Sequence, residues 1–183
     1  MRLSKLAIVA AASTLVALSV QAQAVAAPKT SVISIQPLSA IFGVYAVEYE
    51  HAIAPTVTFG IGGSYWSDDT DGSELKYSSG DIKLRFYPEG RPLQGFSFGG
   101  QAGYTSITDR SSADTFSGGT GSKSTAHGPT IGVALDYNWL LGATKSFYVG
   151  LGVGAKKIFA NADDLGSANL AYPTGRISIG FAF

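Results

Sequence analysis

Charged side chains in this chain occur at alternate positions within otherwise apolar segments. Glu48 and Glu50 flank one tyrosine, and Lys83 and Arg85 flank one leucine. Positions two apart lie on the same face of a β-strand, so each pair points to one side. Four acids and four bases share this setting, and burial would force them to pair because an isolated buried charge is costly. The predicted ion-pair network consists of Glu48, Glu50, Asp81, Lys83, Arg85, Asp136, Lys156 and Arg176.

The sequence gives little support for a catalytic site. A Ser–His–acid hydrolase could be assembled from His127, Ser122 or Ser124, and Asp114, but nothing in the sequence fixes their geometry. The other histidine, His51, lies close to the paired glutamates. The chain contains no nucleophile elbow, zinc motif or phosphate loop. We therefore expect no enzymatic activity, no catalytic residues and no cofactor.

One acidic segment, residues 68–74, has the composition of a calcium loop. Its sequence is Asp-Asp-Thr-Asp-Gly-Ser-Glu, with oxygen donors at alternate positions before a glycine. An EF-hand register with Gly72 in sixth place puts Ser67 first and Ser78 twelfth, so the required carboxylates are missing. A solvated acidic loop without a metal is the preferred interpretation.

The alternation that orders the charges extends along most of the chain and predicts eight β-strands. It is clearest in residues 175–183, where Ile177, Ile179 and Phe181 share one face and Arg176 and Ser178 share the other. Strands of about 9–11 residues cross a bilayer when they are tilted. The predicted strands are residues 32–38, 44–53, 56–66, 77–87, 95–106, 130–140, 146–157 and 172–183.

The face opposite the charges is almost purely apolar, and such a surface would aggregate in water. Closing the sheet in lipid satisfies every backbone hydrogen-bonding group. With eight strands the interior is just wide enough for side chains to fill, so we expect a plugged barrel. The predicted outward residues are Tyr45, Val47, Tyr49, Val57, Phe59, Ile61, Ile82, Leu84, Phe86, Phe96, Phe98, Ala102, Ile131, Val133, Leu135, Tyr137, Phe147, Val149, Leu151 and Val153.

The connections and the aromatic residues both differ between the two ends of the predicted barrel. Short turns are predicted at 51–55, 88–93 and 141–145, and long polar loops at 67–76, 107–129 and 160–171. This asymmetry is typical of outer-membrane barrels, as are two aromatic girdles at the interfaces. The girdle predicted at the long-loop end comprises Tyr65, Trp66, Tyr77, Tyr104, Phe159 and Tyr172.

The amino-terminal residues resemble an export signal. Arg2 and Lys5 precede an apolar run at residues 6–20, which is shorter than the roughly 20 residues a spanning helix needs. We predict a signal peptide at 1–24, with cleavage after residue 26 as the alternative, and a single barrel domain at 25–183. The remaining net charge of −2 gives no indication of a nucleic-acid partner, and the absence of cysteine excludes disulfides.

These features resemble the small outer-membrane barrels of Gram-negative bacteria, the OmpA-, OmpX- and OmpW-like group. The resemblance rests on the amino-terminal signal, the alternating strands and the ending Ile179-Gly180-Phe181-Ala182-Phe183. It implies that Ile179, Phe181 and Phe183 form an assembly signal read by the barrel-assembly machinery. It also implies location in the outer membrane and contact with its lipids and lipopolysaccharide. A second likeness, Gly43-Val44-Tyr45-Ala46-Val47-Glu48-Tyr49-Glu50, is to an uncharacterised family of eight-stranded barrels.

We therefore expect an all-β protein, an eight-stranded antiparallel up-and-down transmembrane β-barrel. Its expected role is structural or surface-interacting, as a monomer, with the lumen closed by ion pairs. Alternatives are a path for protons or ions along these charges, a narrow channel for small apolar solutes, an outer-leaflet lipid-modifying enzyme, and a secreted soluble barrel.

Overall fold

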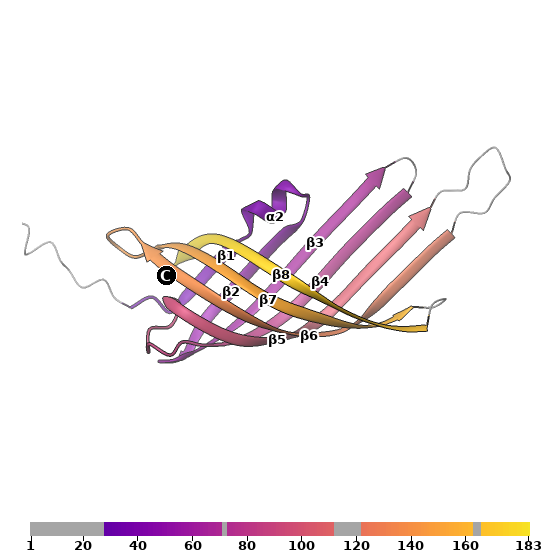
Figure 1. Ribbon diagram of the computed structural model, residues 1–183. Helices are drawn as coiled ribbons and strands as arrows, with labels where there is room; N and C mark the ends of the chain where they lie inside the picture. Colours follow the sequence, from indigo (N-terminus) through magenta and orange to yellow (C-terminus); the bar gives the residue numbers. More distant parts are fainter. Residues whose placement is uncertain (1–27, 71–72, 112–121, 163–165) are drawn as a thin grey trace, which may run out of the picture.

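A computed structural model describes residues 28–70, 73–111, 122–162 and 166–183. Within these residues the chain forms a closed barrel of eight antiparallel strands, ordered as in the sequence, with β8 returning to pair with β1 (Figure 1). The fold class predicted from the alternation is therefore confirmed. The elements are β1 (Ser31–Ile35), α2 (Pro37–Ile41), β2 (Tyr45–Ala54), β3 (Val57–Thr70), β4 (Ser73–Phe86), β5 (Gly95–Ser111), β6 (Ser122–Leu141), β7 (Phe147–Ala162) and β8 (Gly166–Ala182).

The two faces of the barrel wall differ as the period of two predicts. On β6, Val133 is 64% exposed on the outer face, whereas the nearby Asp136 is 3% exposed inside. Every predicted outward side chain lies on the outer face, and the outward apolar residues form a continuous belt around the barrel. A barrel wall with apolar side chains on the outside and charged side chains on the inside is typical of barrels that span a bilayer.

Most strands run further than predicted at one end. The segments expected to be long loops largely continue as paired strands, with Asp68 opposite Leu75, and Asp109 opposite Ser124. The predicted loop bounds are wrong, because the strands are longer than the thickness of a bilayer requires. Alternating polar residues pair their backbones equally well beyond the membrane. We call this the long-hairpin end, and the opposite end, with its three compact connections, the short-turn end.

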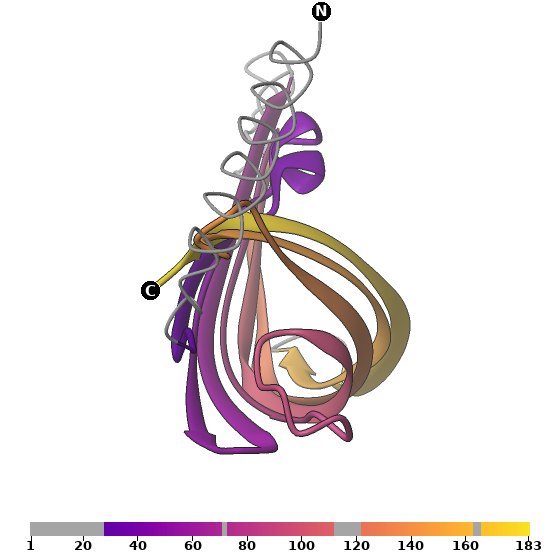
Figure 2. The ribbon, with the colours of Figure 1, turned by 90° about the vertical axis from the view of Figure 1, so that its left-hand side faces the viewer.

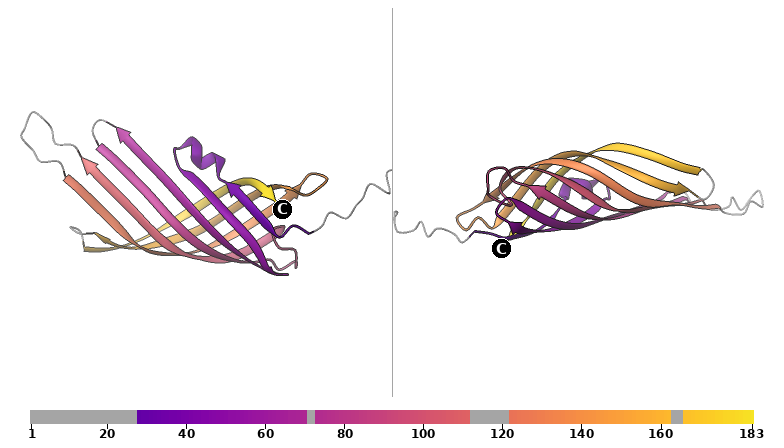
Figure 3. Two further views of the ribbon diagram at one scale, coloured as in Figure 1. Left: turned by 180° about the vertical axis from the view of Figure 1, so that it is seen from behind. Right: turned by 90° about the horizontal axis from the view of Figure 1, so that it is seen from below.

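The first strand is shorter than predicted. It ends at Ile35, and Pro37 begins α2 instead of continuing the strand, since proline lacks an N–H and its φ suits the first helical turn. Consequently β1 pairs with β8 only between Ile35↔Ile179 and Val32↔Ala182. Residues 166–178 of β8 therefore have no strand partner on the side facing β1. The helix α2 lies at this place and contacts both β2 and β8 (Figure 3).

The short-turn end is closed by side chains. Leu93, held at φ 68 in the connection between β4 and β5, is fully buried. It packs with Val32, Tyr148 and Ala182, and Leu140 lies against them. We call these five residues the apolar plug. Figure 2 views the ring of strands from this end.

None of the helices in the described part of the chain is both long and apolar enough to cross a membrane. The predicted signal peptide at 1–24 lies outside the described residues.

Candidate functional site: a closed ionic lumen beneath an open cavity

The even-numbered strands supply the charges of the main ionic cluster. Glu48 and Glu50 come from β2, Lys83 and Arg85 from β4, Asp136 from β6 and Arg176 from β8. These six residues form one connected cluster, which we call the ionic cluster.

The odd-numbered strands supply glycines at the same levels. Gly62 pairs with Glu48 on one side and Asp81 on the other, and Gly152 pairs with Asp136 and Arg176. A Cβ added at Gly152 would collide with the carboxylate of Asp136. Glycine on the intervening strands thus leaves the space into which long charged side chains extend.

Arg85 lies at the centre of the ionic cluster. Its guanidinium forms ion pairs with Glu48 at 2.6 Å, Glu50 at 2.5 Å and Asp136 at 3.0 Å. All three partners are buried. One side chain on β4 therefore connects β2 to β6 across the interior. Neither of these strands is a neighbour of β4 in the sheet.

Arg176 and Lys83 complete the ionic cluster. Arg176 pairs with Glu48 at 3.0 Å and with Asp136 at 2.7 Å, and Lys83 also pairs with Glu48. The cluster contains three acids and three bases, so it is neutral as a unit. Buried charges arranged in this way avoid the desolvation cost that an unpaired ion would carry.

The remaining two predicted residues form a separate pair. Lys156 on β7 contacts Asp81 on β4 at 2.7 Å and donates a hydrogen bond to the hydroxyl of Ser79 at 2.9 Å. Thr105 also donates to Ser79. The structure thus places all eight predicted residues inside the barrel, in two groups and not one.

A chain of hydrogen bonds joins the ionic cluster to the apolar plug. Tyr87 donates to Glu50 at 2.8 Å, Asn138 donates to Tyr87 at 3.1 Å, and Tyr148 donates to Asn138 at 2.6 Å. Glu50 also accepts a hydrogen bond from Thr58. Layers of apolar, neutral polar and ionic side chains therefore close the lumen from the short-turn end inward.

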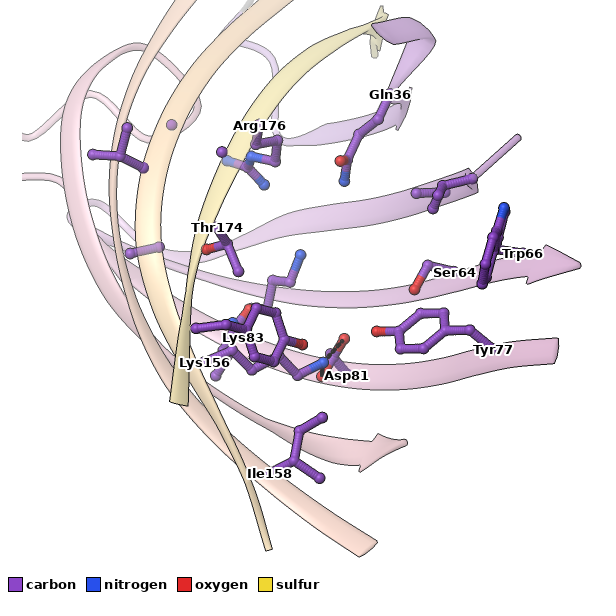
Figure 4. Close-up of a pocket in the computed structure, with 18 of the residues that line it drawn as sticks. Gln36, Ser64, Trp66, Tyr77, Asp81, Lys83, Lys156, Ile158, Thr174 and Arg176 are labelled. Carbon is purple, nitrogen blue, oxygen red and sulfur yellow. Dashed lines mark hydrogen bonds and ion pairs between the residues drawn. The ribbon is translucent and has the colours of Figure 1, made fainter. Parts of the chain in front are cut away.

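Above these layers, toward the long-hairpin end, lies a cavity of about 590 Å³. Its walls include Trp66 from β3, Tyr77 from β4 and Ile158 from β7 (Figure 4). Its floor is made by the charged layer, including Lys83 and Arg176. The interior is thus plugged at one end and hollow at the other.

The cavity corrects part of the predicted aromatic girdle. Tyr65 and Tyr104 lie on the outer face, as expected of interfacial residues. Trp66, Tyr77 and Tyr172 instead line the cavity. Position along a strand does not show which face a residue lies on. Tyr77 is four positions from the inward Asp81 and Tyr172 four from the inward Arg176, and Trp66 is next to the outward Tyr65, so alternation places all three inside. Strict alternation was the signal that could have found them.

The alternative catalytic grouping is not assembled in the described residues. His127 is exposed and contacts the ring of Tyr104 on the outer face, whereas Ser124, three positions away on the same strand, belongs to the inner face. Asp114 lies outside the described residues. His51 faces outward and its ring nitrogen hydrogen-bonds the hydroxyl of Ser31 at 2.8 Å.

The acidic segment 68–74 also differs from its predicted form. Asp68 belongs to β3 and Ser73 to β4, so the segment is the tip of a hairpin and not an extended loop. Residues 71–72 lie outside the description. Across the described residues, no group of three or more metal-ligating side chains is positioned to hold an ion.

The strand number, the antiparallel closure, the apolar outer belt and the ionic interior together define a small closed β-barrel with the wall pattern of a membrane-spanning barrel. Among solved structures, the N-terminal β-barrel domain of OprF from Pseudomonas aeruginosa is similar, with 16% sequence identity and a TM-score of 0.47. CarO2 from Acinetobacter baumannii is also similar, with 12% identity and a TM-score of 0.44. Each match covers 85% of this chain and 98% of the other. No protein-family model and no curated protein matches the chain.

Proposed function

We propose that this protein is an integral outer-membrane barrel with a closed lumen and a structural or surface-interaction role. The observation that carries the proposal is the contact of Arg85 with Glu48, Glu50 and Asp136 across the interior. The apolar plug beneath it supports the same proposal, because both layers place side chains across the interior. The long hairpins provide the surface for contacts outside the membrane.

The proposal includes the surroundings of the barrel. The apolar belt contacts lipid, and lipopolysaccharide meets the polar hairpins beyond it. Ile179, Phe181 and Phe183 lie on the outer face of the last residues, where the barrel-assembly machinery would recognise them; Phe181 and Phe183 are strongly exposed. The barrel functions as a monomer, since β8 pairs with β1 to close the sheet and α2 contacts the part of β8 that β1 does not reach.

Conductance in planar bilayers tests the closed lumen. The purified barrel should insert without producing stable unitary currents. The double variant Arg85→Ala with Glu50→Ala removes one buried acid–base pair and should admit ions, because it opens the layer that spans the lumen.

A matched control comes from the turn between β4 and β5. Arg91 and Glu89 form an exposed ion pair there, and removing both should leave the barrel non-conducting. Stable unitary currents from the unmodified barrel would contradict the closed lumen and favour the narrow-channel alternative.

Cell fractionation tests the location. The barrel should be recovered with outer membranes, require detergent for extraction, and migrate faster on gels before boiling than after. Recovery from the soluble periplasm would instead support a secreted soluble barrel.

A further inference from the structure

The cavity at the long-hairpin end has the features of a binding site for a small amphiphile. Its volume of about 590 Å³ is within the usual range for small-molecule sites. Its wall is apolar or aromatic on several strands, and its charged lining residues belong to the ionic cluster and to the Asp81–Lys156 pair. The apolar and aromatic wall residues include Trp66, Leu75, Tyr77, Ile107, Ile158 and Tyr172.

The charges that face the cavity are predominantly basic. The lining contains Lys83, Arg85, Lys156 and Arg176, but of the acids only Asp81 and Asp136. Glu48 and Glu50 belong to the ionic cluster but do not line the cavity. All three bases of this neutral cluster thus line the hollow, but only one of its three acids does.

Two bases of the ionic cluster reach the hollow more than their acidic partner does, and the acid Asp81, 13% exposed in the wall, is paired with Lys156. The side chains of Lys83 and Arg176 are 14% and 12% exposed, whereas that of their shared partner Glu48 is 6% exposed. Figure 4 shows Lys83 and Arg176 beside the same space, with the amide of Gln36 reaching in from the segment that precedes α2. These donors would meet an anionic head group from two sides.

The cavity also lies next to the outer surface. A second hollow of about 520 Å³ is bordered by Ile35, Tyr45 and Val47 near the end of β1. It shares Gln36, Ala46 and Ser64 with the cavity. The two hollows therefore border one another at these three residues, close to the place where β1 ends.

We propose that the cavity binds a small amphipathic carboxylate, with its head group against Lys83 and Arg176 and its apolar body along Trp66 and Ile158. Charge complementarity selects the anion over a cation of the same length. The site goes beyond the closed-lumen proposal, because binding at the open end does not depend on conduction through the other end.

Fluorescence of Trp66 provides the test. The chain has two tryptophans, and replacing the outward Trp139 with phenylalanine leaves Trp66 as the single reporter. The Trp139→Phe barrel is placed in phosphatidylcholine nanodiscs and titrated with octanoate or with octylammonium. Octanoate should produce a saturable change at a concentration about tenfold lower, the difference expected from one charge-assisted contact.

Two further variants locate the effect. Ser64→Phe fills the cavity at its boundary with the outer hollow and should raise the half-saturating octanoate concentration at least about tenfold. Ser78→Phe adds the same ring to the exposed outer face of the adjacent strand and should change nothing. Lys83→Gln should reduce the preference for octanoate over octylammonium.

Equal responses to octanoate and octylammonium would overturn the proposal, even if the Lys83 variant failed to fold. An octanoate affinity that is the same in the Ser64→Phe and Ser78→Phe barrels would also overturn it. A conducting barrel that still bound octanoate selectively would contradict the closed lumen and leave this site standing.

Discussion

The two halves of the barrel interior share one scaffold and one alternation but differ in how they are filled. In the half near the short turns, charged side chains from even-numbered strands meet over glycines of odd-numbered strands, and the apolar plug seals the end. In the half near the long hairpins, medium and aromatic side chains line the wall around an open cavity. An eight-stranded barrel is therefore not plugged by its diameter alone. Long side chains opposite small ones are also needed.

Removing the centre of the closed half should have the largest effect. Arg85→Ala leaves three buried carboxylates without their shared partner and should lower the free energy of unfolding by about 3–5 kcal/mol. Urea titration of the barrel in lipid vesicles measures this quantity. Arg91→Ala, in an exposed ion pair, should cost at most about 1 kcal/mol. Equal losses in the two variants would show that the ionic cluster contributes nothing specific.

Shortening an apolar side chain to alanine should lower the free energy of unfolding more in the closed half than in the hollow half. Leu93→Ala creates a void in the apolar plug and should destabilise the barrel by about 2–4 kcal/mol. Ile107 faces the cavity, so Ile107→Ala should lower the free energy of unfolding by only about 1 kcal/mol. The same unfolding titration compares the two variants. If the Ile107 variant lost as much stability as the Leu93 variant, the upper half would be packed and not open.

A single methyl group at the level of the ionic cluster should have a smaller effect. Gly152→Ala would push Asp136 away from Arg176 and should cost about 1–3 kcal/mol. Gly80→Ala adds the same methyl group where no atom lies within 4 Å, and should change stability by no more than about 0.5 kcal/mol. A neutral Gly152→Ala substitution would mean that the cluster can shift without loss.

The side of the wall on which each residue lies could be predicted from the sequence. Glu48, Lys83 and Asp136 were assigned to the interior by alternation alone, because successive strand residues point to opposite faces whatever the strand pairs with. The same rule places Trp66 and Tyr77, which lie at the ends of their predicted strands, inside the barrel. The ends of the strands could not be predicted in the same way. Strands that continue beyond the bilayer pair through their backbones, and the sequence there has no apolar alternation to mark them. In the sequence, Pro37 is the one residue that indicates the early end of β1.

The partners of the charges could be predicted only in part. Strand order brings Glu48 and Glu50 within reach of Lys83 and Arg85, and these residues do pair, but strand order does not give the partner of Asp81. Asp81 lies two positions from Lys83 in the sequence, yet its ion pair is with Lys156, 75 residues away on β7. Lys83 pairs instead with Glu48. Which strands face one another across a barrel depends on closure, tilt and stagger, and these are properties of the whole sheet.

The sequence by itself therefore determined that there are eight strands, which face of each is apolar, and that the inner charges balance. These features follow from local alternation and composition, and each strand carries them independently of the others. Only the tertiary structure decided that the charges divide into a cluster and a separate pair, that Leu93 seals one end, and that the other end remains hollow. Those outcomes require side chains from strands distant in the sequence to meet or to miss one another, and the curvature of the closed sheet sets that distance.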